Sequence, residues 1–183
     1  MELSIDNGWL RGARAVPSPN RDERPADVAV DLLVIHGISL PPGQFGGPWI
    51  EALFRNRLPP SRHPYFAGIA DLRVSAHLLI RRDGELVQFV PFHERAWHAG
   101  ESRFGDRTRC NDFSVGIELE GTDDRPYADV QYERLGAVAR ALMAHYPAIA
   151  TDRIVGHSDI APGRKTDPGP AFDWAEFHRQ LQP

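Results

Sequence analysis

The 183-residue sequence predicts an α/β fold, in which a single domain spanning residues 1–183 holds a central mixed β-sheet of about five strands flanked by helices. Three observations lead to this expectation. Short apolar runs typical of strands are interspersed with three segments that have helical spacing. The length fits one hydrophobic core. An apolar fraction of 42% with 25% charged residues is the composition of an ordinary globular protein.

Charge and cysteine content narrow the function classes. The formal net charge is −4, which argues against nucleic acid as a partner. The first residues have no basic segment followed by an apolar one, and no stretch approaches the length of a membrane span. Cys110 is the one cysteine, so an intrachain disulfide is impossible. We therefore expect a cytoplasmic monomer that binds a small molecule and no membrane.

The N-terminal third predicts one buried strand between irregular segments. Residues 8–26 mix glycine, proline and arginine and indicate an extended, irregular lead-in. Residues 28–35 form a continuous apolar run, typical of a central strand covered on both faces, and His36 follows it. The glycine- and proline-rich loop 37–47 is a candidate wall of a substrate groove. Residues 48–58 have the spacing of a short amphipathic helix.

The middle of the chain predicts a hairpin, with strands at 74–80 and 85–90 joined by a turn at Asp83 and Gly84. His77 lies among apolar residues of the first strand and is interpreted as a packed core histidine. His93 and His98 are five residues apart, whereas only a spacing of four would place both on one helical face. A zinc-protease helix is therefore rejected here.

Residues 113–120 alternate with period two, which predicts a strand with an apolar face formed by Phe113, Val115, Ile117 and Leu119. The opposite face carries Glu118, and a core strand should not bury an unpaired carboxylate. The water of a metal site is its functional candidate partner. For Glu120, a solvated face of an edge strand is the favoured interpretation.

The C-terminal third predicts two helices that close the core. Asp129 is expected to cap a helix over 130–145, whose apolar stripe is interpreted as core. Asp173 is expected to cap the closing helix. Between them, the β-branched run 153–155 precedes the turn-rich segment 156–169.

This turn-rich segment supplies two of three candidate metal ligands, His157 and Asp167, and His36 supplies the third. Two imidazoles and one carboxylate leave one position open, which is the arrangement of catalytic zinc. On spacing alone, purely structural roles for these residues stay open. A histidine at a strand end is commonly a hydrogen-bonded structural residue, and Asp167 before Pro168 is a common turn former.

Six stretches together resemble the zinc amidase family, which also contains phage lysozyme-type amidases and peptidoglycan recognition proteins. The stretches occur in order along the chain, at residues 34–36, 39–47, 75–80, 96–100, 111–121 and 156–169. The resemblance implies the zinc amidase fold, Zn²⁺ held by His36, His157 and Asp167, and one amidase domain. It departs from the phage-type pattern at Ala76, where those relatives have a catalytic tyrosine. It also departs at Gly37, where close relatives often have a polar residue.

The implied reaction is hydrolysis of the amide between the lactyl group of N-acetylmuramic acid and L-alanine. Within the family, the expectation is the enzyme of cell-wall recycling that acts on 1,6-anhydro-muropeptides. A lytic amidase acting on polymeric peptidoglycan and a non-catalytic recognition module are the alternatives. The resemblance assigns catalysis to Glu118 and to Lys165, which would stabilise the oxyanion. The expected substrate-binding residues are Arg73, Trp97, His98 and Arg109.

Overall fold

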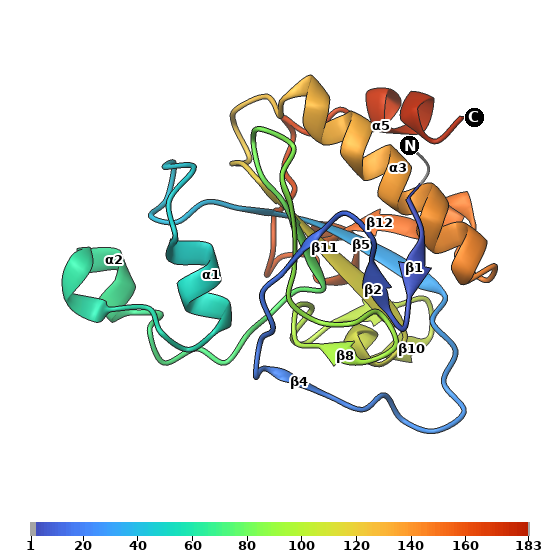
Figure 1. The fold of residues 1–183 in the computed structure, drawn as a ribbon, viewed down its shortest axis with the longest axis horizontal. Coiled ribbons are helices and arrows are strands. Elements are labelled where there is room, and N and C mark those ends of the chain that lie inside the picture. The colour runs from blue at the N-terminus through green and yellow to red at the C-terminus, as the bar shows by residue number, and fades with distance from the viewer. Residues whose placement is uncertain (1–2, 183) are drawn as a thin grey trace.

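A six-stranded mixed sheet runs through the computed structural model, which describes residues 3–182 (Figure 1). The strand order is β12-β5-β11-β6-β7-β3. The four strands from β12 to β6 are parallel, β7 is antiparallel to β6, and β3 is parallel to β7. The predicted mixed sheet is confirmed. The additional strand comes from the lead-in at residues 8–26, which forms three short strands and is therefore more regular than its composition indicated.

The elements have the following bounds. The strands are β1 Ile5–Asp6, β2 Trp9–Leu10, β3 Arg14–Ala15, β4 Arg21–Asp22, β5 Leu32–Ile38, β6 Leu78–Ile80, β7 Leu86–Gln88, β8 Arg95–Ala96, β9 Arg103–Phe104, β10 Arg107–Thr108, β11 Ser114–Glu120 and β12 Ile154–Gly156. The α-helices are α1 Trp49–Phe54, α2 Pro64–Ala67, α3 Asp129–His145, α4 His157–Ile160 and α5 Trp174–Gln180. Short 3₁₀ turns cover Pro60–Arg62, Cys110–Asp112 and Thr151–Arg153.

Strands β5 and β11 form the centre of the sheet. Each has a parallel neighbour on both sides, as the continuous apolar run of β5 predicted. The run was expected to end before His36, but pairing with β11 continues to Ile38, so His36 lies inside the strand. In this register Glu118 is paired with His36. Paired residues on adjacent strands project from the same face, so their side chains are neighbours.

The two faces of the sheet are divided between core and site. Helices α3 and α5 lie together over one face (Figure 1). The core beneath them contains Leu33 and Ile35 of β5, and Val115, Ile117 and Leu119 of β11. The alternate residues, His36 and Glu118 among them, therefore face the other side. Phe113 was expected on the core face but precedes β11, and it packs with Leu32 and Val34 on the other side.

The predicted hairpin is confirmed as β6 and β7, paired from Leu78 with Gln88 to Ile80 with Leu86. His77, directly before β6, is fully buried, as expected for a core histidine. Its Nδ1 accepts a hydrogen bond from the backbone N–H of Gly116 at 3.0 Å. The helix expected over 48–58 is shorter, since α1 ends at Phe54.

Helix α3 begins one residue earlier than predicted. Asp129 is its first residue and not its cap, because the capping position is Ala128, whose N–H donates to the side-chain oxygen of Gln131 at 3.0 Å. The closing helix follows the prediction, with the Asp173 carboxylate accepting from the Glu176 N–H at 2.9 Å. Among the described residues, none of the helices combines the length and the apolar character that crossing a bilayer requires.

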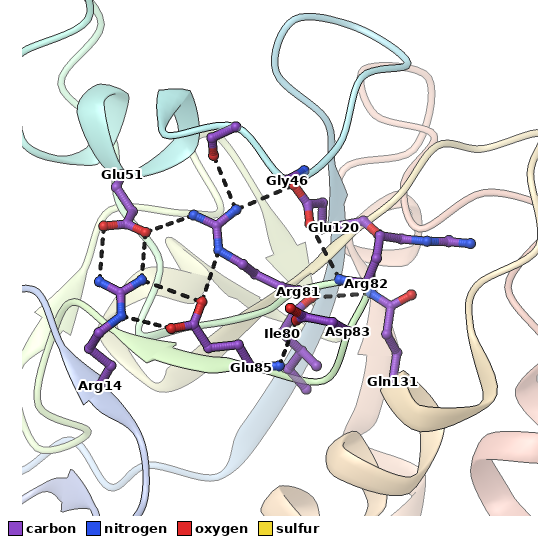
Figure 2. Close-up of polar contacts among 11 residues, drawn as sticks. Arg14, Gly46, Glu51, Ile80, Arg81, Arg82, Asp83, Glu85, Glu120 and Gln131 are labelled. Carbon is purple, nitrogen blue, oxygen red and sulfur yellow. Dashed lines mark hydrogen bonds and ion pairs between the residues drawn. The ribbon is translucent and has the colours of Figure 1, made fainter.

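The solvated edge expected for Glu120 is wrong. Strand β11 is central, and Glu120 is only 1% exposed. Figure 2 shows its carboxylate held by several donors. It accepts from the backbone N–H groups of Gly46 at 2.7 Å and Arg82 at 3.3 Å, and lies 3.4 Å from the guanidinium of Arg81. Glu120 therefore ties the 37–47 loop to the sheet.

Candidate metal centre and cleft

A cleft of about 300 Å³ opens on the sheet face opposite α3. The cleft is lined by polar side chains and by an apolar wall. The wall comes from α1, α2 and the residues that follow α2. The polar lining includes His36, Trp97, His98, Glu118, His157, Lys165 and Asp167. The apolar wall consists of Leu53, Phe54, Tyr65, Ile69 and Leu72. The structure thus gathers seven of the nine predicted site residues into one cleft.

Each candidate metal ligand is placed by a different element. His36 projects from the central strand β5, and His157 is the first residue of α4, directly after β12. Strand β12 pairs in parallel with β5, so the two histidines arise from neighbouring strands. Asp167 lies in the following loop, where its backbone carbonyl accepts from the Ser158 N–H at 3.0 Å. This bond closes the loop back onto the start of α4.

The three ligand atoms form a compact triangle. His36 Nδ1 lies 2.9 Å from His157 Nδ1, and Asp167 Oδ2 lies 3.2 Å and 3.1 Å from these two nitrogens. Zinc bonds of about 2.0 to 2.1 Å in a tetrahedron would separate such ligands by roughly 3.3 to 3.4 Å. The group can hold a metal ion. The nitrogen and oxygen donors, and the room left for a fourth ligand, fit zinc.

The second nitrogen of His157 supports this assignment. Its Nε2 lies 3.2 Å from the carbonyl oxygen of Ala99, so it carries the proton and donates it. Nδ1 then presents a lone pair to the triangle. A metal-ligating histidine almost always donates its other N–H to such an acceptor.

Burial and neighbouring side chains set the charge states of His36 and Asp167. Burial lowers the pKa of His36 to about 4, so its imidazole is neutral at pH 7. Burial alone would raise the pKa of Asp167, but the two imidazoles of His157 and His36 beside its carboxylate outweigh that effect and hold that pKa well below its usual range. A neutral His36 imidazole and an ionised Asp167 carboxylate are the protonation states that metal binding needs.

Glu118 stands beside this group without a partner of its own. Its Oε2 is buried and has no hydrogen-bond partner among the described residues. Burial, followed by the negative charge of Asp167, raises the pKa of Glu118 well above its usual value. A carboxylate with a raised pKa beside a metal site is suited to take up and release a proton.

The remaining predicted residues differ in their relation to the cleft. Lys165 is exposed and lines it, and Trp97 lines it while donating its indole N–H to Asp22 at 3.1 Å. Arg73 is exposed and lies between two lining residues without lining the cleft itself. Arg109 lies in a neighbouring groove with Arg103 and Arg164 and pairs with Asp112 at 3.3 Å.

Two features of the site were missed by the sequence analysis. The apolar wall includes Tyr65 and Leu72, each 47% exposed, in a segment without any recognisable motif. Tyr127 donates its hydroxyl to the Pro168 carbonyl at 2.9 Å, next to Asp167. It also fills the space beside Gly37, where a Cβ would overlap the tyrosine hydroxyl. An aromatic residue in the loop before α3 gave no signal of this role.

Comparison with known proteins identifies the family of this chain. A family model described as N-acetylmuramoyl-L-alanine amidase matches residues 26–170. The chain belongs to this family. The resemblance seen in the sequence motifs is therefore confirmed, and the protein is an amide hydrolase of the N-acetylmuramoyl-L-alanine amidase family.

Relatives in the N-acetylmuramoyl-L-alanine amidase family cover nearly the whole chain. The 1,6-anhydro-N-acetylmuramyl-L-alanine amidase AmpD of Enterobacter cloacae is 65% identical over 179 residues, which is 98% of this chain and 95% of that protein. The crystal structure of a Se-Met AmpD derivative has a TM-score of 0.94 at 64% identity, and the match covers 96% of this chain and 98% of that one.

A more distant amidase structure contains a substrate. AmiD from Escherichia coli, in complex with anhydro-N-acetylmuramic acid-L-Ala-D-γ-Glu-L-Lys, has a TM-score of 0.61 at 28% identity. The match covers 98% of this chain and 66% of that one. The α/β fold with its central mixed sheet is thus the fold of these amidases.

Proposed function

We propose that this protein is a zinc-dependent amidase that hydrolyses the bond between the lactyl group and L-alanine in 1,6-anhydro-N-acetylmuramyl peptides during cell-wall recycling. The observation that carries the proposal is the triangle of His36, His157 and Asp167 with the unpartnered Glu118 beside it in one cleft. Similarity to AmpD supports the anhydro-sugar substrate. A monomer in the cytoplasm is the setting expected from the sequence.

The residues divide the chemistry among them. Zinc, when bound by His36, His157 and Asp167, would lower the pKa of a coordinated water and polarise the scissile carbonyl. Glu118 takes the proton of the attacking water and returns it to the leaving amine, as general base and then general acid. Lys165 places its ammonium group at the cleft, where it stabilises the developing oxyanion.

Recognition is proposed to come from the rim of the cleft. The half-buried indole of Trp97 offers an aromatic surface to the sugar or peptide. The stem peptide carries carboxylates, for which arginine is the natural partner. Arg73 and Arg109 are both exposed and remain the proposed partners, although Arg109 requires a peptide that extends beyond the cleft into the adjacent groove. His98 was expected to join them, but both its ring nitrogens face protein groups.

The test is mass spectrometry of the products after incubation with an anhydro-muropeptide and, separately, with intact peptidoglycan. Each substrate is given to zinc-loaded and to chelator-stripped protein. Zinc-dependent release of free peptide from the anhydro substrate, with little from the polymer, is the expected result. Release from the polymer instead would identify a lytic enzyme. Binding of either substrate without cleavage would leave a recognition module and overturn the proposal.

The ligand assignment has its own test. Asp167→Ala is expected to weaken zinc binding by more than the roughly 10 to 100-fold that loss of a ligand's hydrogen-bonded neighbour costs. The dissociation constant is measured by competition with a chelator. Asp124→Ala, at an exposed position on a different loop, is the matched control and should bind zinc like the parent. Parent-like zinc binding by Asp167→Ala would remove Asp167 from the ligand set.

A further inference from the structure

A chain of hydrogen bonds leads from the candidate ligand His36 into the protein interior. His36 Nε2 lies 2.9 Å from His98 Nδ1, and His98 Nε2 lies 3.1 Å from the hydroxyl of Ser114. The Ser114 hydroxyl in turn lies 2.6 Å from the backbone carbonyl of Cys110. Ser114 and Cys110 are fully buried, so water does not compete for these contacts.

The far end of the chain determines its direction. The Cys110 carbonyl can only accept a hydrogen bond, so the Ser114 hydroxyl must donate its single proton to that carbonyl. The Ser114 oxygen therefore accepts from His98, which places the His98 proton on Nε2. A neutral imidazole has one N–H, so His98 Nδ1 is an acceptor for the Nε2–H of His36. His36 Nδ1 is left with a lone pair, and this lone pair faces His157 and Asp167.

The surroundings of His98 keep its ring in this position. The backbone N–H groups of His98 and Ala99 both donate to the side-chain oxygen of Asn111, at 3.1 Å and 2.8 Å. Gly116 lies directly under the ring, where a Cβ would overlap it. The rings of His36 and His98 meet edge to face, with centroids 5.0 Å apart and planes at 87°.

We propose that His98 is a positioning residue that fixes the tautomer and orientation of the metal ligand His36 through this hydrogen-bonded chain, with Ser114 and the Cys110 carbonyl as its anchor. This role replaces the substrate contact expected for His98. The inference rests on the proposed metal site. Loss of such a neighbour typically costs about 10 to 100-fold in metal affinity.

The first experiment measures zinc dissociation constants by chelator competition in three variants. His98→Leu fills the space without hydrogen bonding and is expected to weaken zinc binding by about 10 to 100-fold. His98→Asn can place its amide oxygen near the position of Nδ1, so it is expected to bind zinc more tightly than His98→Leu. Ser114→Ala removes only the anchor, and roughly a fivefold loss is expected, the worth of one neutral hydrogen bond.

His77→Asn is the matched control. His77 is a fully buried histidine whose ring centroid lies 5.8 Å from that of His98. It bonds to Gly116 and to no metal ligand, so its replacement should change the melting temperature and leave zinc affinity like the parent's. Equal zinc affinity in His98→Leu and the parent, or equal losses in His98→Leu and His77→Asn, would overturn the inference.

A second experiment needs no variant. Nitrogen-15 correlation spectra across the imidazole rings of the zinc-loaded protein report which nitrogen of His98 carries its proton. The proton is expected on Nε2, and a proton on Nδ1 would overturn the inference. If the parent binds no zinc at this group, the proposed function itself fails. If the parent binds zinc and His98→Leu binds it with the same affinity, only the positioning role of His98 is refuted.

Discussion

Two carboxylates on the same face of β11 have opposite surroundings. Glu120 is buried and accepts hydrogen bonds from two backbone N–H groups, with the Arg81 guanidinium beside it (Figure 2). Glu118, two residues earlier, has a buried oxygen without any donor among the described residues. The strand and the residue type are shared, so the neighbours alone separate a structural carboxylate from a reactive one.

The difference identifies where the fold retains an unfavourable group. A buried carboxylate without donors costs free energy, and a chain selected only for stability would satisfy it as Glu120 is satisfied. Arg81 is itself bound by Glu51 at 2.7 Å and Glu85 at 3.3 Å, so that end of the sheet is saturated with partners. Glu118 keeps a buried oxygen without a partner among the described residues, as its proposed role as general base requires.

The largest expected effect comes from removing the unpartnered group. Glu118→Ala should lower turnover of an anhydro-muropeptide by about 10² to 10⁴-fold, the usual worth of a positioned general base. Zinc content should stay at the parent level, because Glu118 is not a ligand. Kinetics and metal analysis on the same preparation test both statements. Glu133→Ala, on the exposed side of α3, is the control. Unchanged turnover in Glu118→Ala would remove Glu118 from the mechanism.

Stability should respond in the opposite way at the two positions. Glu120→Ala leaves the backbone N–H groups of Gly46 and Arg82 without their acceptor and removes one carboxylate from Arg81, so it should lower the free energy of unfolding by about 3 kcal/mol. Glu118→Ala removes an unsatisfied group and should raise that free energy in the zinc-free protein by about 1 kcal/mol. Denaturant titrations measure both. Equal destabilisation by the two changes would show that Glu118 and Glu120 do not differ in their contribution to stability.

Titration sharpens the same contrast. The folded-state pKa of Glu118 is raised above the value of 4.5 that the unfolded chain has. Its contribution to stability is therefore fully present below pH 4.5 and is lost as the pH rises through the raised value. Unfolding of zinc-free parent and Glu118→Gln is compared across this range. The parent should lose stability relative to the variant as pH rises, and a constant difference would contradict the assignment.

The smallest effect on stability is expected at Glu85, the most exposed of the carboxylates that pair with Arg81. Glu85 pairs with Arg14 at 2.8 Å, and its side chain is 39% exposed. An exposed pair contributes about 0 to 1 kcal/mol, so Glu85→Gln should cost far less stability than Glu120→Ala. Denaturant titration in low and high salt measures the difference. A loss as large as that of Glu120→Ala would show that burial does not rank these carboxylates.

Local patterns of apolar, polar and turn residues predicted the strands and the faces of the sheet. The continuous apolar run predicted the centrality of β5, and the Asp83-Gly84 turn between apolar runs predicted the β6–β7 hairpin. Alternation placed Glu118 and Glu120 on one face, opposite Ile117. All three are local signals, carried by residues that are neighbours in the chain.

The surroundings of individual side chains could not be predicted from the sequence, because they depend on partners from distant segments of the chain. The burial of Glu120 depends on Arg81 and Gly46, which are 39 and 74 positions away. The same holds for the contact of His98 with His36, 62 positions apart. Alternation defines a face but says nothing about which donors from elsewhere arrive at it. The candidate site residues were predicted from motifs, and their individual surroundings required the fold.

The space shared by Gly37 and Tyr127 also restricts the order in which this site can change over generations. A side chain at position 37 would collide with the tyrosine hydroxyl, so a variant acquiring one there first would displace the ring and its bond to Pro168. Exchange of Tyr127 for a smaller residue would have to come first or simultaneously. The two positions are therefore expected to be epistatic: an exchange of Gly37 alone should disturb the bond of Tyr127 to Pro168, and a simultaneous exchange of Tyr127 for a smaller residue should relieve the overlap.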